Sequence, residues 1–104
     1  MANDDFSITL KESTEGVKFI VQGRLDYTNA DKLQFQLDET FKNGINNIIL
    51  NMHLVEYLSS TGIRVILKAY KDLKEAGGKL GIEQPSERVR NVLGLVALDQ
   101  MLIQ

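Results

Sequence analysis

The sequence predicts a single α/β domain with a mainly parallel sheet of four or five strands, an antiparallel hairpin strand at the N-terminal edge and three helices. Two observations predict this class. Strand-like and helix-like runs alternate along most of the chain, and helices between successive strands imply right-handed crossovers and parallel pairing. The first two strand-like runs instead follow each other across a turn at Glu15-Gly16, which is typical of a hairpin.

The hairpin is expected from residues 6–10 and 17–21. The first run alternates apolar and polar residues, as a strand with one buried face does, and the second run continues as a strand of similar length. Gly23 is expected to end the second strand. These boundaries predict an edge strand paired with one neighbour.

The first helix is expected to begin near Thr28, which can act as its N-cap, and to stop at Asn43-Gly44. Its buried stripe is expected to consist of Leu33, Leu37 and Phe41. Phe35 lies nearly opposite this stripe at 100° per residue and is therefore expected at the surface. Two interpretations of Phe35 are open, an isolated exposed aromatic or a contact with a partner or a second copy.

The middle of the chain predicts a buried strand at residues 47–51, a loop over residues 52–58 and a second helix that runs to about Ala76. Apolar residues of this helix recur at three- and four-residue spacing, which is typical of a helix with one buried face. The glycines that follow Ala76 can supply a left-handed helix cap.

The C-terminal quarter is expected to hold a strand at residues 79–83, a short third helix that ends at Gly94, and a last short strand at residues 101–103. No repeat, low-complexity tract or linker divides the sequence. Residues 1–104 are therefore expected to form one domain, which suits a chain of this length.

Composition argues against several classes of protein. The net charge of −2 gives no electrostatic footprint for nucleic acid, and no apolar run approaches the roughly 18 residues of a membrane span. The N-terminus lacks the basic and then apolar order of a signal peptide, and the chain has no cysteine. A cytoplasmic protein without direct nucleic-acid binding or membrane insertion is expected.

Catalytic and cofactor sites are also not expected. His53 is the only histidine, so a multi-histidine zinc site is excluded. The sequence holds no G-x-S-x-G elbow, no P-loop and no G-x-G-x-x-G. We therefore expect no enzyme, no metal and no cofactor, and nucleotide binding is the weakest of the functions considered.

Three consecutive hydroxyl residues, Ser59, Ser60 and Thr61, lie where the second helix is expected to begin. Ser60 is expected to be the N-cap, with its hydroxyl accepting from the N–H of Gly62 or Ile63. A helix N-terminus carries partial positive charge and unpaired N–H groups, so it tolerates a phosphate. Two interpretations remain open: Ser60 only caps the helix, or its phosphorylation switches the charge of a surface.

Three motifs in order resemble the STAS domain of bacterial anti-sigma factor antagonists. Residues 21–26, Val-Gln-Gly-Arg-Leu-Asp, are similar to the family's apolar-x-Gly-x-Leu/Ile-Asp turn. Tyr57 and Ser59-Ser60-Thr61-Gly62-Ile63 resemble the family's loop aromatic followed by Asp-Ser-Ser/Thr-Gly-Leu. Residues 76–80, Ala-Gly-Gly-Lys-Leu, are similar to the glycine turn after the second helix. The likeness covers about residues 6–103.

The resemblance implies an anti-sigma factor antagonist rather than an enzyme. Such a protein binds an anti-sigma factor that is also a serine kinase, is switched off by phosphorylation, here at Ser60, and is restored by a serine phosphatase. Ser59 and Thr61 are the less favoured acceptors. The partner-binding residues expected from the resemblance and from position are Asp26, Tyr57, Ser59, Ser60, Thr61, Gly62 and Arg64.

The sequence departs from the family at two positions of this stretch. Ser59 stands where the family usually has Asp, which motivates an alternative: a constitutive STAS adaptor, for instance a subunit of a transporter complex, without phosphorylation switching. Arg64 stands where relatives often have a small residue, and it is either an ordinary exposed arginine or a group that reads the phosphate or an acidic partner. Asp26 likewise either contacts the partner or only bonds local N–H groups.

Overall fold

The computed structural model describes residues 6–14 and 16–95 of the chain. In order, its elements are β1 (Ser7–Ser13), β2 (Gly16–Leu25), α1 (Tyr27–Lys42), β3 (Asn47–Leu58), α2 (Ser60–Glu75), β4 (Lys79–Glu83) and α3 (Glu87–Leu95). The sheet has the order β1-β2-β3-β4, with β1 antiparallel to β2 and the other pairs parallel. The predicted fold class is confirmed, and the strand expected at residues 101–103 lies outside the described part.

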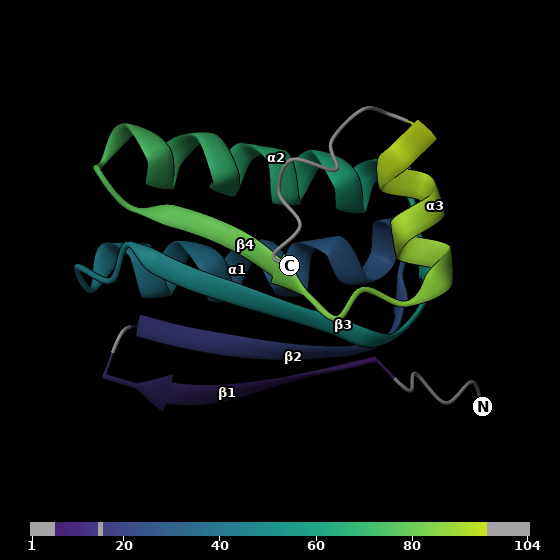
Figure 1. The fold of residues 1–104 in the computed structure, drawn as a ribbon, viewed down its shortest axis with the longest axis horizontal. Coiled ribbons are helices and arrows are strands. Elements are labelled where there is room, and N and C mark those ends of the chain that lie inside the picture. Colours follow the sequence, from purple (N-terminus) through teal and green to yellow (C-terminus); the bar gives the residue numbers. More distant parts are fainter. Residues whose placement is uncertain (1–5, 15, 96–104) are drawn as a thin grey trace.

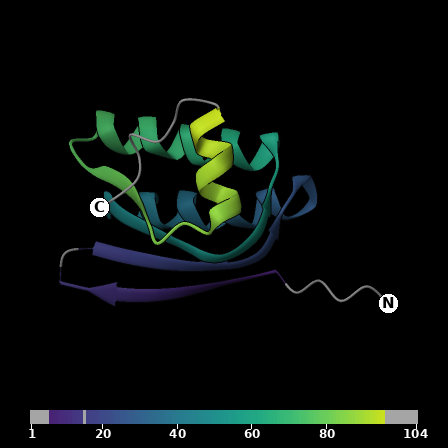
Figure 2. The same ribbon diagram turned by 45° about the vertical axis from the view of Figure 1, so that its right-hand side comes forward.

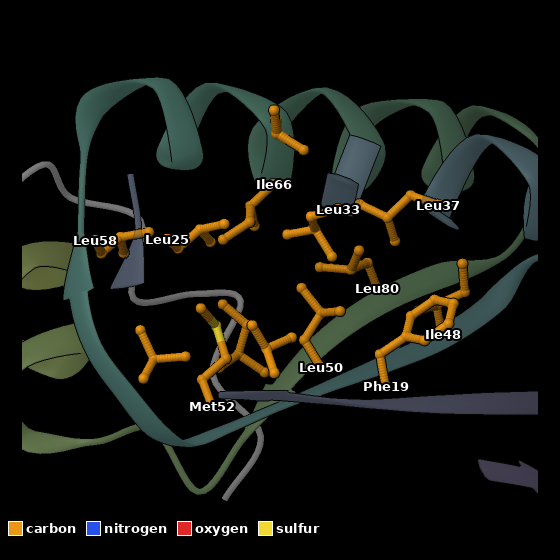
Figure 3. Packing of buried hydrophobic residues seen from close by; sticks show 14 of the residues in the cluster. Phe19, Leu25, Leu33, Leu37, Ile48, Leu50, Met52, Leu58, Ile66 and Leu80 are labelled. Atoms are coloured by element: carbon orange, nitrogen blue, oxygen red, sulfur yellow. The ribbon is translucent and has the colours of Figure 1, made fainter. Parts of the chain in front are cut away.

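Helices α1 and α2 lie side by side over one face of the sheet, and α3 stands at the end of the sheet where these two helices begin (Figures 1 and 2). Alternation along β2 produces this layering, because Val17, Phe19, Val21, Gly23 and Leu25 are buried while the residues between them are at least partly exposed. Figure 3 shows the resulting core between the helices and the strands. Each fully buried Leu or Phe contributes about 1.5–3 kcal/mol of burial free energy.

The other face of the sheet carries polar groups that are paired with one another. Lys18 Nζ on β2 lies 2.8 Å from Glu83 Oε2 on β4, and Asn51 Nδ2 on β3 donates to the same oxygen at 2.9 Å. The bond from Lys18, followed by that from Asn51, holds the pKa of Glu83 below its ordinary value. This network ties three strands together on the face that the helices leave uncovered.

The expectation of a loop over residues 52–58 was wrong, because β3 continues through these residues to Leu58. Between the Ile20–Asn51 and Leu25–Leu58 pairs, the register shifts twice, so β3 holds two more residues than β2 over the same span. Met52, Val55 and Leu58 are consequently the buried residues of this part of β3. These apolar residues are three positions apart and so lack the period of two that is typical of a strand, because each bulge adds one residue to the strand. Gly23 also does not end β2, which continues to Leu25.

The buried stripe of α1 follows the expected pattern with one exception. Leu33 and Leu37 are buried and Phe35 is 60% exposed, as expected, but Phe41 is 38% exposed and lies at the margin of the core rather than in it. The expected glycine turn after α2 is confirmed, since Gly77 adopts φ 84° and the N–H of Gly78 donates to Leu73 O at 2.8 Å. None of the described helices is long and apolar enough to cross a membrane.

Candidate functional site

The candidate site lies at the C-terminal edge of the parallel strands β2 and β3, where α1 and α2 begin (Figure 1). Ser59 joins the two strand ends: its N–H donates to Leu25 O at 3.0 Å, and its hydroxyl donates to the same carbonyl oxygen at 3.1 Å. In open α/β sheets, ligands are bound outside the carboxyl ends of the parallel strands. The bond pattern therefore fixes the start of α2 against the end of β2.

Ser59, and not Ser60, is the N-cap of α2, which corrects the sequence-based expectation. Ser59 has the extended conformation of a cap residue, with φ −87° and ψ 169°, and its Oγ accepts from the N–H of Gly62 at 3.1 Å. Adjacent serines offer equivalent local capping signals. The choice between them is made by the long-range bonds from Ser59 to Leu25, which the local sequence does not encode.

Ser60 is the first residue of α2 and is exposed. Its hydroxyl forms no hydrogen bond with any residue in the described ranges. Thr61, the next residue, is half-buried. Of the three hydroxyl residues, Ser60 therefore combines the greatest exposure with a free hydroxyl.

Gly62 allows the first turn of α2 to approach β2 closely. A Cβ at this position would lie 2.9 Å from Leu25 Cγ, 3.0 Å from Leu25 O and 3.1 Å from Leu58 Cδ1, all shorter than ordinary contacts. Figure 3 shows Leu25 and Leu58 together beneath this turn. Gly62 is therefore needed for packing of α2 against the end of β2, and a role of Gly62 in partner binding stays a prediction.

Asp26 is the N-cap of α1, a position that the sequence analysis gave to Thr28. Its Oδ1 accepts from the Thr28 hydroxyl at 2.7 Å and from the N–H groups of Thr28 and Asn29 at 3.1 Å each. The bond from the Thr28 hydroxyl, with smaller contributions from both N–H groups, holds the pKa of Asp26 below its ordinary value. The capping interpretation of Asp26 is thus confirmed, and a partner contact by its second oxygen stays a prediction.

Tyr57 lies beside an arginine that the sequence analysis did not single out. Tyr57 on β3 is the cross-strand neighbour of Arg24 on β2, and the Arg24 guanidinium lies 4.4 Å from the centre of the Tyr57 ring. Arg24 Nε is also 3.9 Å from Asp26 Oδ2. Because two register shifts in β3 create this pairing, counting along the sequence does not find it.

Two further exposed side chains belong to this edge. Tyr27, the first residue of α1, is 74% exposed and directly follows the cap residue Asp26. Its position after a capping acid was a signal available in the sequence. Arg64 is exposed on α2 and forms no ion pair with a described residue, one helical turn after Ser60.

Two proteins of similar sequence are named as anti-sigma factor antagonists, the first of them as a putative one. BtrV of Bordetella bronchiseptica is 31% identical over 72 residues, which are 69% of this chain but only 62% of BtrV. The anti-sigma F factor antagonist of Paenibacillus polymyxa is 26% identical over 93 residues, 88% of this chain and 80% of that protein.

Solved structures of the Bacillus anti-sigma factor antagonist SpoIIAA share the fold. The unphosphorylated form has a TM-score of 0.83 and covers 93% of this chain and 86% of SpoIIAA; the phosphorylated form has a TM-score of 0.77 and covers 93% and 89%. Both are 20% identical to this chain, a likeness that establishes the fold alone. The STAS domain family pattern matches residues 7–103. Because this match spans nearly the whole chain, the protein belongs to the STAS domain family.

Proposed function

We propose that the protein is an anti-sigma factor antagonist: it binds an anti-sigma factor, frees the sigma factor that this partner holds, and is switched off by phosphorylation at Ser60. The observation that carries the proposal is the exposed, unbonded hydroxyl of Ser60 on a helix start that Ser59 holds in place. The relative from Paenibacillus, named an anti-sigma F factor antagonist, supports the binding function. SpoIIAA, whose phosphorylated form has been solved, supports the switch.

The hydroxyl bonds favour Ser60 over Ser59 as the phosphate acceptor. A kinase that used Ser59 would break the bonds of its Oγ to Leu25 O and Gly62 N, and the new phosphate would lie against the Leu25 carbonyl oxygen. Both changes cost free energy, since a lost cap alone costs about 0.5–2 kcal/mol. Ser60 carries no such cost, and Thr61 is less exposed.

Phosphorylation of Ser60 would change the surface while leaving the fold intact. A phosphoserine adds about −1.5 to −2 charges at neutral pH, and the partial positive charge of the α2 N-terminus offsets part of this charge within the protein. Against an acidic or closely packed partner surface the phosphate imposes repulsion and desolvation. Each 1.4 kcal/mol of this penalty weakens binding about tenfold.

The proposed partner-binding residues contribute in two ways. Side chains that can reach a partner are those of Asp26, Tyr57, Ser60, Thr61 and Arg64, together with Arg24 and Tyr27 beside them. Ser59 and Gly62 act by position instead, because the Ser59 hydroxyl is fully used in the cap and Gly62 is buried against Leu25.

The alternative of a constitutive adaptor rests on the replacement of the family's Asp by Ser59. The structure weakens that argument, since Ser59 performs the capping that an acceptor side chain at this position provides. The two functions differ in a direct binding measurement. An adaptor without switching would bind its partner equally well as Ser60→Ala and Ser60→Asp, whereas a switched antagonist would lose affinity only as Ser60→Asp.

The experiment uses the cognate anti-sigma factor with serine kinase activity that the proposal requires. The purified protein is incubated with that kinase and ATP at neutral pH, and the product is mapped by mass spectrometry. The proposed location of the protein is the cytoplasm. We expect one phosphate on Ser60, none on Ser60→Ala, and retained modification on Thr61→Ala as the matched control. Absence of modification at residues 59–61 would count against the switch.

A further inference from the structure

The outer edge of β1 is regular, and no other described strand pairs with it. In both ribbon views no described element lies on the far side of β1 (Figures 1 and 2). The pairing of β1 with β2 runs through seven consecutive pairs without a bulge, and the strand contains no proline. Natural proteins usually protect such an edge with prolines, bulges or charged side chains, because its free N–H and C=O groups can pair with another strand. Of these devices β1 has only the charges of Lys11 and Glu12.

An apolar surface adjoins this edge on the helix side. Ile8 and Leu10 lie opposite the buried residues Val21 and Phe19, so both point toward the helix layer, and Leu10 is nevertheless 48% exposed. Between β1 and α1 lies an open hollow of about 460 Å³, lined by Phe6, Ser7, Ile8, Asp31, Lys32, Phe35 and Gln36. A strand added at the edge of β1 would cover Leu10 and approach this hollow.

We propose that this edge binds a second copy of the chain, through antiparallel β1–β1′ pairing centred on Thr9. In this register Thr9 faces Thr9′, and Ile8 faces Leu10′ twice around the two-fold axis. Threonine pairs and aliphatic pairs both stabilise neighbouring antiparallel strands, by about 0.2–1 kcal/mol each. Lys11 faces the uncharged Ser7′, so no like charges meet.

Charge complementarity supports the same register. Glu12 lies on the helix side of β1, opposite Val17, and in the dimer it faces Phe6′. The ammonium group of Lys32 lies 6.0 Å from the centre of the Phe6 ring, so each Glu12 would approach Lys32′ of the other copy. A register centred on Leu10 would place Glu12 against the apolar Ile8′, and one centred on Lys11 would oppose two lysines.

The dimer is expected to be weak. Seven paired residues at about 3.4 Å each span roughly 24 Å, and the contact is smaller than the interfaces of stable dimers. We therefore expect a dissociation constant on the order of 0.1 mM. The inference is independent of the proposed function, since Ser59 and Ser60 contribute neither to the edge nor to the hollow.

Sedimentation up to about 1 mM protein provides the first test, at concentrations chosen around the expected dissociation constant. We expect reversible dimerisation that Leu10→Lys abolishes, because the substitution places a charge opposite Ile8′. Leu54→Lys is the matched control, since Leu54 on β3 is similarly exposed, at 46%. Circular dichroism of both variants verifies that they fold.

Cysteine cross-linking tests the register and is free of background, because the chain has no cysteine. Residues directly opposite in antiparallel strands have Cα atoms about 4.5–5.5 Å apart, within reach of a disulfide. Thr9→Cys should therefore cross-link with itself, whereas Ser7→Cys and Lys11→Cys should cross-link only when mixed. A monomer at about 1 mM, or Thr9→Cys that cross-links only with Lys11→Cys, would overturn the proposal.

Discussion

Replacing Ser59 with alanine tests the assignment of the α2 cap. The substitution removes the acceptor for the N–H of Gly62 and the hydroxyl bond to Leu25 O, while the backbone bond from the Ser59 N–H to Leu25 O remains. Loss of an N-cap serine costs about 0.5–2 kcal/mol, and the additional bond places the expected loss toward the upper part of that range. For a domain of this size, about 1–2 kcal/mol lowers Tm by roughly 4–15 °C.

The matched control is Ser60→Ala, one residue further along the chain. Because the Ser60 hydroxyl forms no bond with the described residues, its removal is expected to change the free energy of unfolding by no more than about 0.5 kcal/mol. Urea unfolding followed by circular dichroism measures both variants. If Ser60→Ala were as destabilising as Ser59→Ala, Ser60 would be the cap and the reasoning from the Ser59 bonds would be refuted.

Three further variants test other parts of this edge. Gly62→Ala should destabilise the fold by about 1–3 kcal/mol because its Cβ meets Leu25 and Leu58, whereas Gly94→Ala, in open space on α3, should stabilise it by about 0.5–1 kcal/mol in the same urea assay. The folded pKa of Asp26 lies below its unfolded value, so the Asp26 carboxylate stabilises the fold above that unfolded value and this contribution is lost as the pH falls. Wild type should therefore exceed Asp26→Asn in stability at pH 7, and the difference should shrink toward pH 3; a constant difference would show that ionisation of Asp26 does not contribute. The role of Arg64 can be tested with phosphoserine installed at position 60 during expression. Arg64→Gln should raise the phosphate pKa by about 0.2–0.4 units in a ³¹P NMR titration, whereas Lys71→Gln, farther along α2, should not. Equal titration curves would show that Arg64 does not interact with the phosphate.

Regular elements with a clear period were predictable from the sequence, and elements set by distant contacts were not. The apolar spacing of α2 and the glycines after it placed that helix to within a residue at its end. Strand β3 was cut short because the spacing of Met52, Val55 and Leu58 reflects bulges that form only against β2. The Arg24–Tyr57 contact depends on those same bulges.

The caps show the same limit at single-residue scale. The N-cap of α1 is Asp26, two residues before the expected Thr28, and the N-cap of α2 is Ser59, one residue before the expected Ser60. Local capping rules allow several candidates in each stretch. Hydrogen bonds to the end of β2 distinguish these candidates. Asn29 Nδ2 donates to Arg24 O near the start of α1, and the Ser59 hydroxyl donates to Leu25 O at the start of α2. Carbonyl groups at the end of β2 therefore contribute to where each helix starts.

A serine at position 59 has an electrostatic consequence for the proposed switch. An aspartate could accept from the N–H of Gly62, but it could not donate to Leu25 O, and it would place a negative charge one residue before Ser60. The neutral hydroxyl gives the cap without that charge. A phosphate on Ser60 then meets less repulsion within its own protein, so its second ionisation is easier and its full charge is directed at the partner. Ser59→Asp should accordingly raise the pKa of phosphoserine 60 in the ³¹P titration, and an unchanged pKa would show that residue 59 does not influence the charge of the switch.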